Sequence, residues 1–222
     1  TGDLVIRDNS LLENVDGLES LTSIGLDLVF RNNPAPDNLA GLSGLEAIGR
    51  DFIIEGNFKL NNLDGLSSLV SIARDLKVES NPALANFEGL SALESIGRDL
   101  IVTRNEALEK LDGLATLVNI GSDLVIKNNE ILRSLVGVDS LTTIGGDFSL
   151  LQFPDIVGLS SLASIGGNFN IYENSKLTDI DELTSLAAIG GNLNIYANPV
   201  LKNVDGLSSL ASVGGDVHIY DN

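Results

Sequence analysis

Apolar and polar residues alternate over short stretches of this chain, and these stretches return at a fixed interval. In residues 192–196 the aliphatic side chains Leu193 and Ile195 stand between polar or aromatic neighbours. Such alternation is typical of a short strand with one buried face. From Leu201 to Val213, apolar residues follow at every third position, which favours a 3-10-like or extended wall over a long helix. The pattern predicts one strand and one wall in each repeat, with neighbouring strands joined in a parallel sheet.

An acidic or amide residue directly before each strand marks the repeat. These markers are Asp3, Asp27, Asp51, Asp75, Asp99, Asp123, Asp147, Asn168, Asn192 and Asp216. Successive markers lie 24 residues apart, except that 21 residues separate Asp147 from Asn168. A fixed period of this length predicts a solenoid, in which each coil buries its apolar side only against its neighbours. We expect one solenoid domain over residues 1–222, with about nine 24-residue repeats, a partial tenth, and an irregular 21-residue repeat at 145–165.

A column of asparagines follows the strands at the same period. It contains Asn9, Asn33, Asn57, Asn81, Asn105, Asn129, Asn174 and Asn198, and it continues to Asn222. A buried carboxamide stacked on its copies can bond to the backbone of the turn and to the copies above and below. We therefore expect a structural ladder in this column.

The ladder is interrupted in the irregular repeat, where Phe153 replaces Asn and three residues are missing before Ile156. Two interpretations are open. The change creates a kink or a pocket beside Leu151 and Phe153, or it is a tolerated deletion in which Phe fills the space that the lost residues leave.

A short helical turn is expected where Asp205 and Gly206 stand, because Asp is a favoured N-cap residue. The same position holds Asp16, Asp64, Asp112 and Asp181. We interpret these residues as helix caps rather than as catalysts.

Two features of the repeat resemble known families. The Leu-x-Ile-x-x-Asn-x-x-Leu core resembles leucine-rich repeats, and Ile-Gly-Gly-Asp-Leu-x-Ile is similar to the repeats of receptor L domains, the ligand-binding modules of insulin- and growth-factor-receptor ectodomains. Bacterial surface proteins with many near-identical copies are the most similar variant. The resemblance covers nearly all 222 residues. It implies a β-dominated α/β solenoid, right-handed, with one parallel sheet on its recognition face and short helical or 3-10 turns. The chain departs from the receptors in lacking cysteine modules and capping segments.

The charge of the chain narrows the range of partners. The formal net charge is −18, so nucleic acid and anionic membrane surfaces are not expected as partners, because both need clustered Lys and Arg. No apolar run is long enough to span a membrane. Basic proteins, neutral glycans and cations remain open, and the acidity also serves solubility.

The expected location is extracellular or at the cell surface, in line with the resemblance. No signal-peptide pattern is present, so the chain reads as a mature or excised segment. Because neither end carries a polar capping segment, end-to-end self-association is also expected.

The outward strand positions vary from coil to coil, as expected for residues that contact a ligand. Four residues after the marker, the last three coils carry Tyr172, Tyr196 and Tyr220, which are all the tyrosines of the chain. Two residues after the marker, the same coils carry Asn170, Asn194 and His218. Aromatic and amide side chains together favour binding of a protein or a glycan. Recent duplication of neighbouring coils explains the same pattern without a ligand.

We do not expect an enzyme. The chain has one histidine and no cysteine, and His218 lies in the last coil at an outward position. No insertion lengthens a coil to build a cleft. The predicted function is a non-enzymatic recognition or adhesion module that needs no cofactor. The alternative is a rigid acidic spacer within a larger surface protein.

Two further alternatives are a calcium-stabilised solenoid and an ice-binding solenoid. The stacked marker carboxylates repel one another, so they need donors or cations. Backbone N–H groups of the Gly-Gly turns are candidates, as are Arg50, Arg74 and Arg98. Calcium between coils would serve equally, although the Gly-Gly-x-Gly-x-Asp signature of calcium-binding solenoids is missing from the sequence. Regular ranks of Thr, expected for ice binding, are also missing from the sequence.

Overall fold

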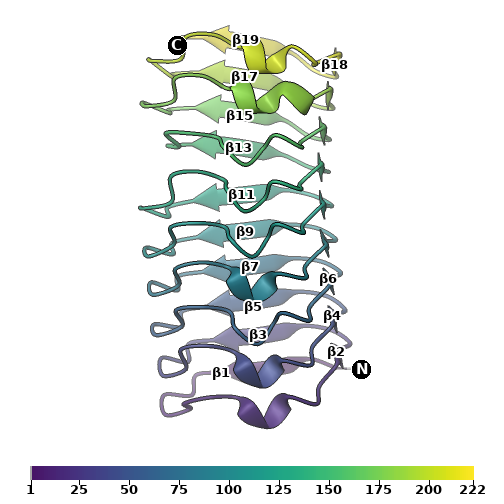
Figure 1. The fold of residues 1–222 in the computed structure, drawn as a ribbon, viewed down its shortest axis with the longest axis vertical. Coiled ribbons are helices and arrows are strands. Elements are labelled where there is room, and N and C mark those ends of the chain that lie inside the picture. Colours follow the sequence, from purple (N-terminus) through teal and green to yellow (C-terminus); the bar gives the residue numbers. More distant parts are fainter. Residues whose placement is uncertain (1) are drawn as a thin grey trace.

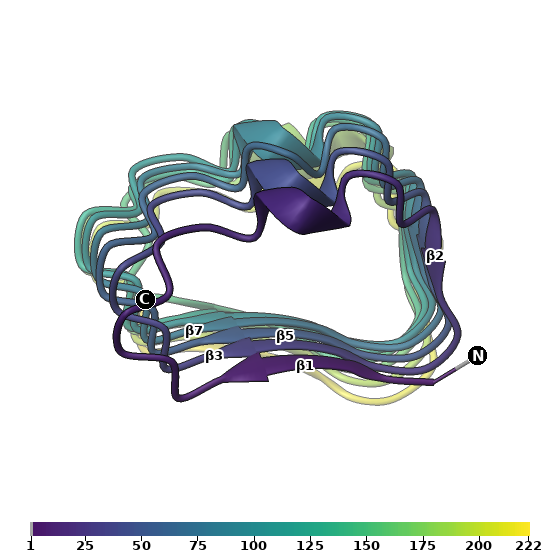
Figure 2. The same ribbon diagram turned by 90° about the horizontal axis from the view of Figure 1, so that it is seen from below.

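A computed structural model describes residues 2–222. The chain winds into a parallel β-solenoid of about nine turns (Figure 1). Along the stack, longer strands form one side of every coil, short strands form a narrow side, and turns or 3-10 helices lie opposite the longer strands (Figure 2). The predicted parallel solenoid is therefore confirmed, and nearly all of its regular structure is sheet.

The longer strands form a ten-stranded parallel sheet over residues 2–222, in chain order. They are β1 (Leu4–Arg7), β3 (Leu28–Arg31), β5 (Phe52–Glu55), β7 (Leu76–Glu79), β9 (Leu100–Thr103), β11 (Leu124–Lys127), β13 (Phe148–Leu151), β15 (Phe169–Tyr172), β17 (Leu193–Tyr196) and β19 (Val217–Tyr220). Their register places equivalent residues side by side, as in the pairing of Asn170 with Asn194. Each outward column of the sequence is thus a row across the sheet.

A second parallel sheet of nine strands was not expected, and the prediction of a single sheet is wrong for residues 2–222. Its strands are β2 (Ser23–Ile24), β4 (Ala47–Ile48), β6 (Ser71–Ile72), β8 (Ser95–Ile96), β10 (Asn119–Ile120), β12 (Thr143–Ile144), β14 (Ser164–Ile165), β16 (Ala188–Ile189) and β18 (Ser212–Val213). Strands of two residues are too short to alternate visibly in sequence. They pair because the coils stack in register, which brings the backbone of each coil within hydrogen-bond reach of the next.

Helical structure in the described chain is limited to five 3-10 helices. They are η1 (Asp16–Leu18), η2 (Ala40–Leu42), η3 (Glu88–Leu90), η4 (Asp181–Ser185) and η5 (Asp205–Leu207). The remaining coils form a turn instead, and in these coils the equivalent glycine has a positive φ, between 104° for Gly65 and 111° for Gly158. A positive φ is incompatible with a helical turn, so the glycine conformation separates the two kinds of coil.

The predicted caps are wrong in two ways: no 3-10 helix begins at Asp64 or Asp112, and the helices at Asp16 and Asp205 are capped from two residues earlier. Asp16 and Asp205 lie inside their 3-10 helices, and their side chains make no capping hydrogen bond. The capping group is the carboxamide two residues earlier: Asn203 Oδ1 accepts the backbone N–H of Asp205 at 2.9 Å, and Asn14 does the same for Asp16 at 3.3 Å. This is an Asx turn, in which a short polar side chain replaces a backbone acceptor.

The asparagine column forms a continuous ladder as far as Asn129. The backbone N–H of Asn57 donates to Asn81 Oδ1 at 3.0 Å, and Asn57 Nδ2 donates to the carbonyl of Phe30 at 2.9 Å. Asn33, Asn57, Asn81, Asn105, Asn174 and Asn198 are fully buried, whereas Asn9 in the first coil is exposed. Buried polar groups need partners, and each ladder residue obtains them from the coils next to it.

The residue before each ladder position adopts a left-handed conformation, with φ between 53° and 68°. These residues are Asp8, Asn32, Gly56, Ser80, Arg104, Asn128, Gln152, Glu173, Ala197 and Asp221. Only one of them is glycine, although this conformation costs other residues about 1–2 kcal/mol. The bonds of the ladder hold the backbone in this turn at the end of every strand.

The marker carboxylates also form a ladder. The backbone N–H of Asp51 donates to Asp27 Oδ1 at 3.1 Å, and the same bond joins every successive pair of markers. The donor is therefore the next marker itself rather than the Gly-Gly turn. Arg50 Nε lies 3.7 Å from Asp27 Oδ1, so the arginine pairs with the marker of the preceding coil, and Arg74 and Arg98 repeat the arrangement.

Candidate recognition surface

All three tyrosines point away from the core, in a single row across β15, β17 and β19. The rings of Tyr172 and Tyr196 are stacked with centroids 5.2 Å apart and planes 11° apart. Tyr196 and Tyr220 are stacked at 5.1 Å and 3°. The register of the sheet sets this spacing, because adjacent strands lie about 4.8 Å apart.

Stacking decides which parts of the tyrosines a ligand can reach. Neighbouring rings cover both faces of Tyr196, so this residue presents its edge and its hydroxyl to solvent. Burial raises the pKa of Tyr196 above its ordinary value of 10.0, and the neighbouring Tyr172, Tyr220 and Glu173 raise it further. The hydroxyl of Tyr196 therefore stays protonated well above neutral pH and can donate a hydrogen bond.

A second row, of amide and imidazole groups, runs beside the tyrosines. Asn170 Nδ2 donates to Ser149 Oγ at 3.1 Å, and Asn194 Nδ2 donates to Asn170 Oδ1 at 2.8 Å. Asn194 Oδ1 in turn lies 3.0 Å from His218 Nδ1. An amide oxygen only accepts, so Nδ1 carries the proton and Nε2 of His218 is the acceptor of the neutral ring. The six predicted ligand-binding residues thus lie together in two adjacent rows.

Next to Tyr172, the sheet face is hollowed. A pocket of about 220 Å³ lies between β11 and β15 and is lined in part by Val125, Ser149, Leu151 and Tyr172. Leu151 is the register partner of Tyr172, so one ring face of Tyr172 is directed toward this hollow while Tyr196 covers the other. Tyr172 is therefore the tyrosine best placed to offer an aromatic face to a ligand.

The hollow continues into an opening of the sheet between β11 and β13. These strands pair at only two positions, Leu124 with Phe148 and Val125 with Ser149. The neighbouring strands β9 and β11 pair at all four positions. A wider step between β11 and β13 is visible in the stack (Figure 1).

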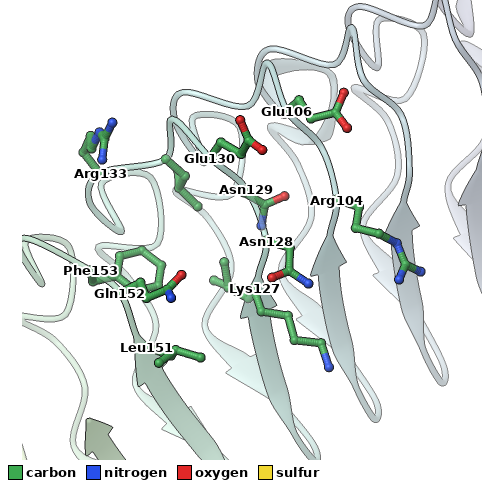
Figure 3. A pocket seen from close by; sticks show the side chains of 12 residues that line it. Arg104, Glu106, Lys127, Asn128, Asn129, Glu130, Arg133, Leu151, Gln152 and Phe153 are labelled. Atoms are coloured by element: carbon green, nitrogen blue, oxygen red, sulfur yellow. The ribbon is translucent and has the colours of Figure 1, made fainter. Parts of the chain in front are cut away.

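A second pocket, of about 530 Å³, fills this opening and shares Ile126, Lys127 and Leu151 with the hollow. Asn129 and Phe153 lie on opposite sides of it (Figure 3). Phe153 is 5% exposed, so its ring is packed into the core. The strands that separate at this coil are β11 and β13. The irregular coil therefore has both properties considered from the sequence, a pocket beside Leu151 and Phe153 and a phenylalanine that fills space.

The outer face of the N-terminal coils carries ion pairs beside a mostly aliphatic row, which contains Val5, Val29, Ile53, Ile101 and Val125. Lys77 Nζ lies 2.9 Å from Asp75 Oδ2, and Arg31 bonds Glu55 at 2.6 Å. Burial alone would raise the pKa of Asp75, but the hydrogen bond from Lys77, the backbone N–H of Asp99 and the charges of Lys77 and Arg98 lower it below its ordinary value of 3.8. The hydrogen bond to Asp75 raises the pKa of Lys77.

Residues 2–222 contain no group of three or more His, Cys, Asp or Glu side chains arranged to hold a metal ion. Within the same range, none of the helices has the length and apolar character that a membrane span requires. No protein-family model matches the chain, and comparisons with curated proteins and with solved structures gave no match either.

The sequence indicated the two rows but not the opening of the sheet. The signals were present, because the 21-residue interval and Phe153 both fall in this coil. They did not reveal that the strands lose half of their pairing, since a deletion in the wall does not by itself specify how the sheet responds.

Proposed function

We propose that this protein is a non-enzymatic recognition module that binds a glycan or a protein on the outer face of its ten-stranded sheet. The observation that carries the proposal is the outward row of Tyr172, Tyr196 and Tyr220 beside the row of Asn170, Asn194 and His218. Aromatic groups next to hydrogen-bonding groups are enriched where proteins contact ligands.

The proposal places the module among leucine-rich-repeat or receptor L-domain-like solenoids of bacterial surface proteins, with an extracellular or cell-surface location. The support is the repeat motif, which recurs in the stacked coils of the parallel solenoid except the irregular one. Binding would use the face of Tyr172 in the hollow and the edges and hydroxyls of Tyr196 and Tyr220.

A rigid acidic spacer is the second candidate, and one observation favours it. The tyrosines stack on one another, and Asn170, Asn194 and His218 bond to one another. Both rows therefore satisfy much of their own bonding capacity and stabilise the sheet without a ligand.

Screening against immobilised glycans and proteins separates the two candidates. We expect binders whose affinity falls at least about tenfold when Tyr172 and Tyr196 are both replaced by alanine, because two aromatic contacts are lost. The matched control is Arg7→Ala, which changes the same outward column in β1, far from the tyrosines. Absence of any binder, or equal binding by the double variant and the control, would favour the spacer.

A further inference from the structure

The ladder defect at Phe153 leaves particular hydrogen-bonding groups without partners. In the regular coils each ladder asparagine supplies one carboxamide: its oxygen accepts from the previous ladder N–H, and its nitrogen donates to a strand carbonyl of the previous coil. Position 153 has no carboxamide. Among residues 2–222, no acceptor therefore meets the N–H of Asn129, and no ladder donor meets the carbonyl of Ile126.

The separated strands leave a second set of groups open at the same place. In a regular coil the N–H of Asn32 donates to the carbonyl of Glu55 at 2.9 Å. The equivalent bond from Asn128 to Leu151 is missing within the described chain, because pairing of β11 with β13 ends at Val125. For the same reason, the carbonyl of Ile126 does not meet the N–H of Leu151.

These groups lie on one strand edge and line one pocket. Ile126, Asn128 and Asn129 all border the 530 Å³ opening, with Leu151 and Phe153 across from them (Figure 3). A strand carbonyl and the N–H two residues later are the pair that one residue of an extended peptide satisfies with its own N–H and carbonyl. A carboxamide two residues further along that peptide would then occupy the vacant ladder position, as in the repeat itself.

From this complementarity we propose that the opening between β11 and β13 binds a short extended peptide segment carrying an Asn or Gln side chain. Its backbone pairs with Ile126 and Asn128, and its carboxamide completes the ladder at Asn129. Apolar side chains of the segment contact Leu151 and Phe153. This site adjoins the hollow beside Tyr172, with which it shares Ile126, Lys127 and Leu151, but Tyr172 does not line it, and its ligand is a peptide.

The charged side chains around the opening are consistent with an uncharged carboxamide on the peptide. Lys127 and Arg133 are balanced by Glu106 and Glu130, and Arg104 is paired with Glu79 at 3.2 Å. A carboxylate in place of the carboxamide would accept from Asn129 but could not donate to Ile126. We therefore expect the site to reject Asp and Glu at this position.

Three capped tripeptides test the proposal: Leu-Ala-Asn, Leu-Ala-Asp and Leu-Ala-Leu. Acetyl and N-methylamide caps leave the Asn side chain as the only primary carboxamide. In an NMR titration of the whole chain, the Asn peptide is expected to bind about 30-fold more tightly than the Leu peptide, the factor that two net hydrogen bonds give. The amide signals of Asn128, Asn129 and Leu151 should shift. Equal affinities for the three peptides, or shifts elsewhere only, would overturn the proposal.

The variant Phe153→Asn provides the second test, because it supplies the missing carboxamide from within the chain. We expect it to lose the preference for the Asn peptide while the signals of distant coils stay unchanged. If the preference survives in a folded Phe153→Asn protein, the ladder position is not the binding site. The Tyr172→Ala and Tyr196→Ala double variant should keep the preference, so failure of the tyrosine surface and failure of this site give different results.

Discussion

Two blocks of coils lie on either side of the irregular repeat and share one backbone but differ in their outward rows. In residues 2–144 the outward face contains ion pairs, Arg31–Glu55 within one row and Lys77–Asp75 along a single coil. In residues 166–222 they contain stacked rings and bonded amides. In-register stacking places equivalent side chains about 4.8 Å apart, where like charges repel. Uncharged side chains that bond to their own copies avoid this repulsion. The N-terminal row instead places like charges side by side at Arg7–Arg31 and Glu55–Glu79, with an ion pair between Arg31 and Glu55.

The comparison also shows what happens at the boundary. Both blocks have an unbroken asparagine ladder, and only the coil between them lacks a ladder residue. At that coil the sheet loses half of its pairing on one side. The loss of pairing thus coincides with two changes in this coil, the replacement of the ladder Asn by Phe153 and the loss of three residues.

The largest expected effect on stability comes from substitutions at two positions of the asparagine ladder. Asn81→Leu in the N-terminal block should lower the free energy of unfolding by on the order of 4 kcal/mol, because Asn57, Ile54 and Glu79 lose their partners in the buried ladder. Phe153→Asn should change it by less than about 1 kcal/mol, since lost burial of the ring offsets the new bonds. Urea denaturation measures both, and equal losses would show that the ladder does not determine stability.

The next largest effect is the dependence of stability on pH, which should differ between the two blocks. The pKa of Asp75 is lowered in the folded state, so its contribution to stability is present above about pH 4 and is lost as the pH falls through the folded value. Asp75→Asn should flatten the acid side of a plot of Tm against pH. If wild type and variant lose stability in parallel below pH 4, the Lys77–Asp75 pair does not contribute.

On the alkaline side, the raised pKa of Tyr196 gives the opposite sign. Its contribution is complete below its ordinary pKa of 10.0 and is lost as the pH rises through the higher folded value. Lys77, whose pKa is also raised, adds a loss in the N-terminal block. Absorbance titration should show one tyrosine ionising late in the wild type, and Tyr172→Phe with Tyr220→Phe should bring the remaining tyrosine closer to 10.0. An unchanged titration would mean that its neighbours do not affect Tyr196.

The smallest effect concerns the residue before each ladder position. Both blocks have a left-handed backbone there, but the residue type differs. Ala197 has φ 53° and Gly56 has φ 68° at equivalent positions. Ala197→Gly should raise stability by up to about 1 kcal/mol, because the left-handed conformation strains alanine. Gly56→Ala should lower it by a similar amount, because alanine is strained at this φ, whereas the exposed Asn32 side chain, whose Oδ1 would lie 2.5 Å from the added Cβ, can move away. Thermal unfolding of the pair gives the two signs, and a loss in both would contradict the role assigned to φ.

The sequence predicted the solenoid, the strand register and the position of the tyrosine row, because all three follow from a fixed period. It did not predict the second sheet, because two-residue strands show no visible alternation. It also missed the Asx caps, because Asp205 and Asn203 are both favourable capping residues and only the structure shows that Asn203 makes the bond. The covering of ring faces in the tyrosine stack depends on side-chain rotamers. The opening at β11 depends on how three missing residues redistribute strain, which no local pattern encodes.

The tyrosine stack also gives this molecule a probe at one end only. The chain contains no tryptophan, and its three tyrosines all lie in the last three coils. Intrinsic fluorescence therefore reports on the C-terminal end of the rod, whereas far-ultraviolet circular dichroism averages over every strand. A rod whose coils contact only their neighbours can unravel from one terminus. During heating, a change in tyrosine fluorescence before the change in circular dichroism would indicate unfolding from the C-terminus. A change in fluorescence after it would indicate unfolding from the N-terminus.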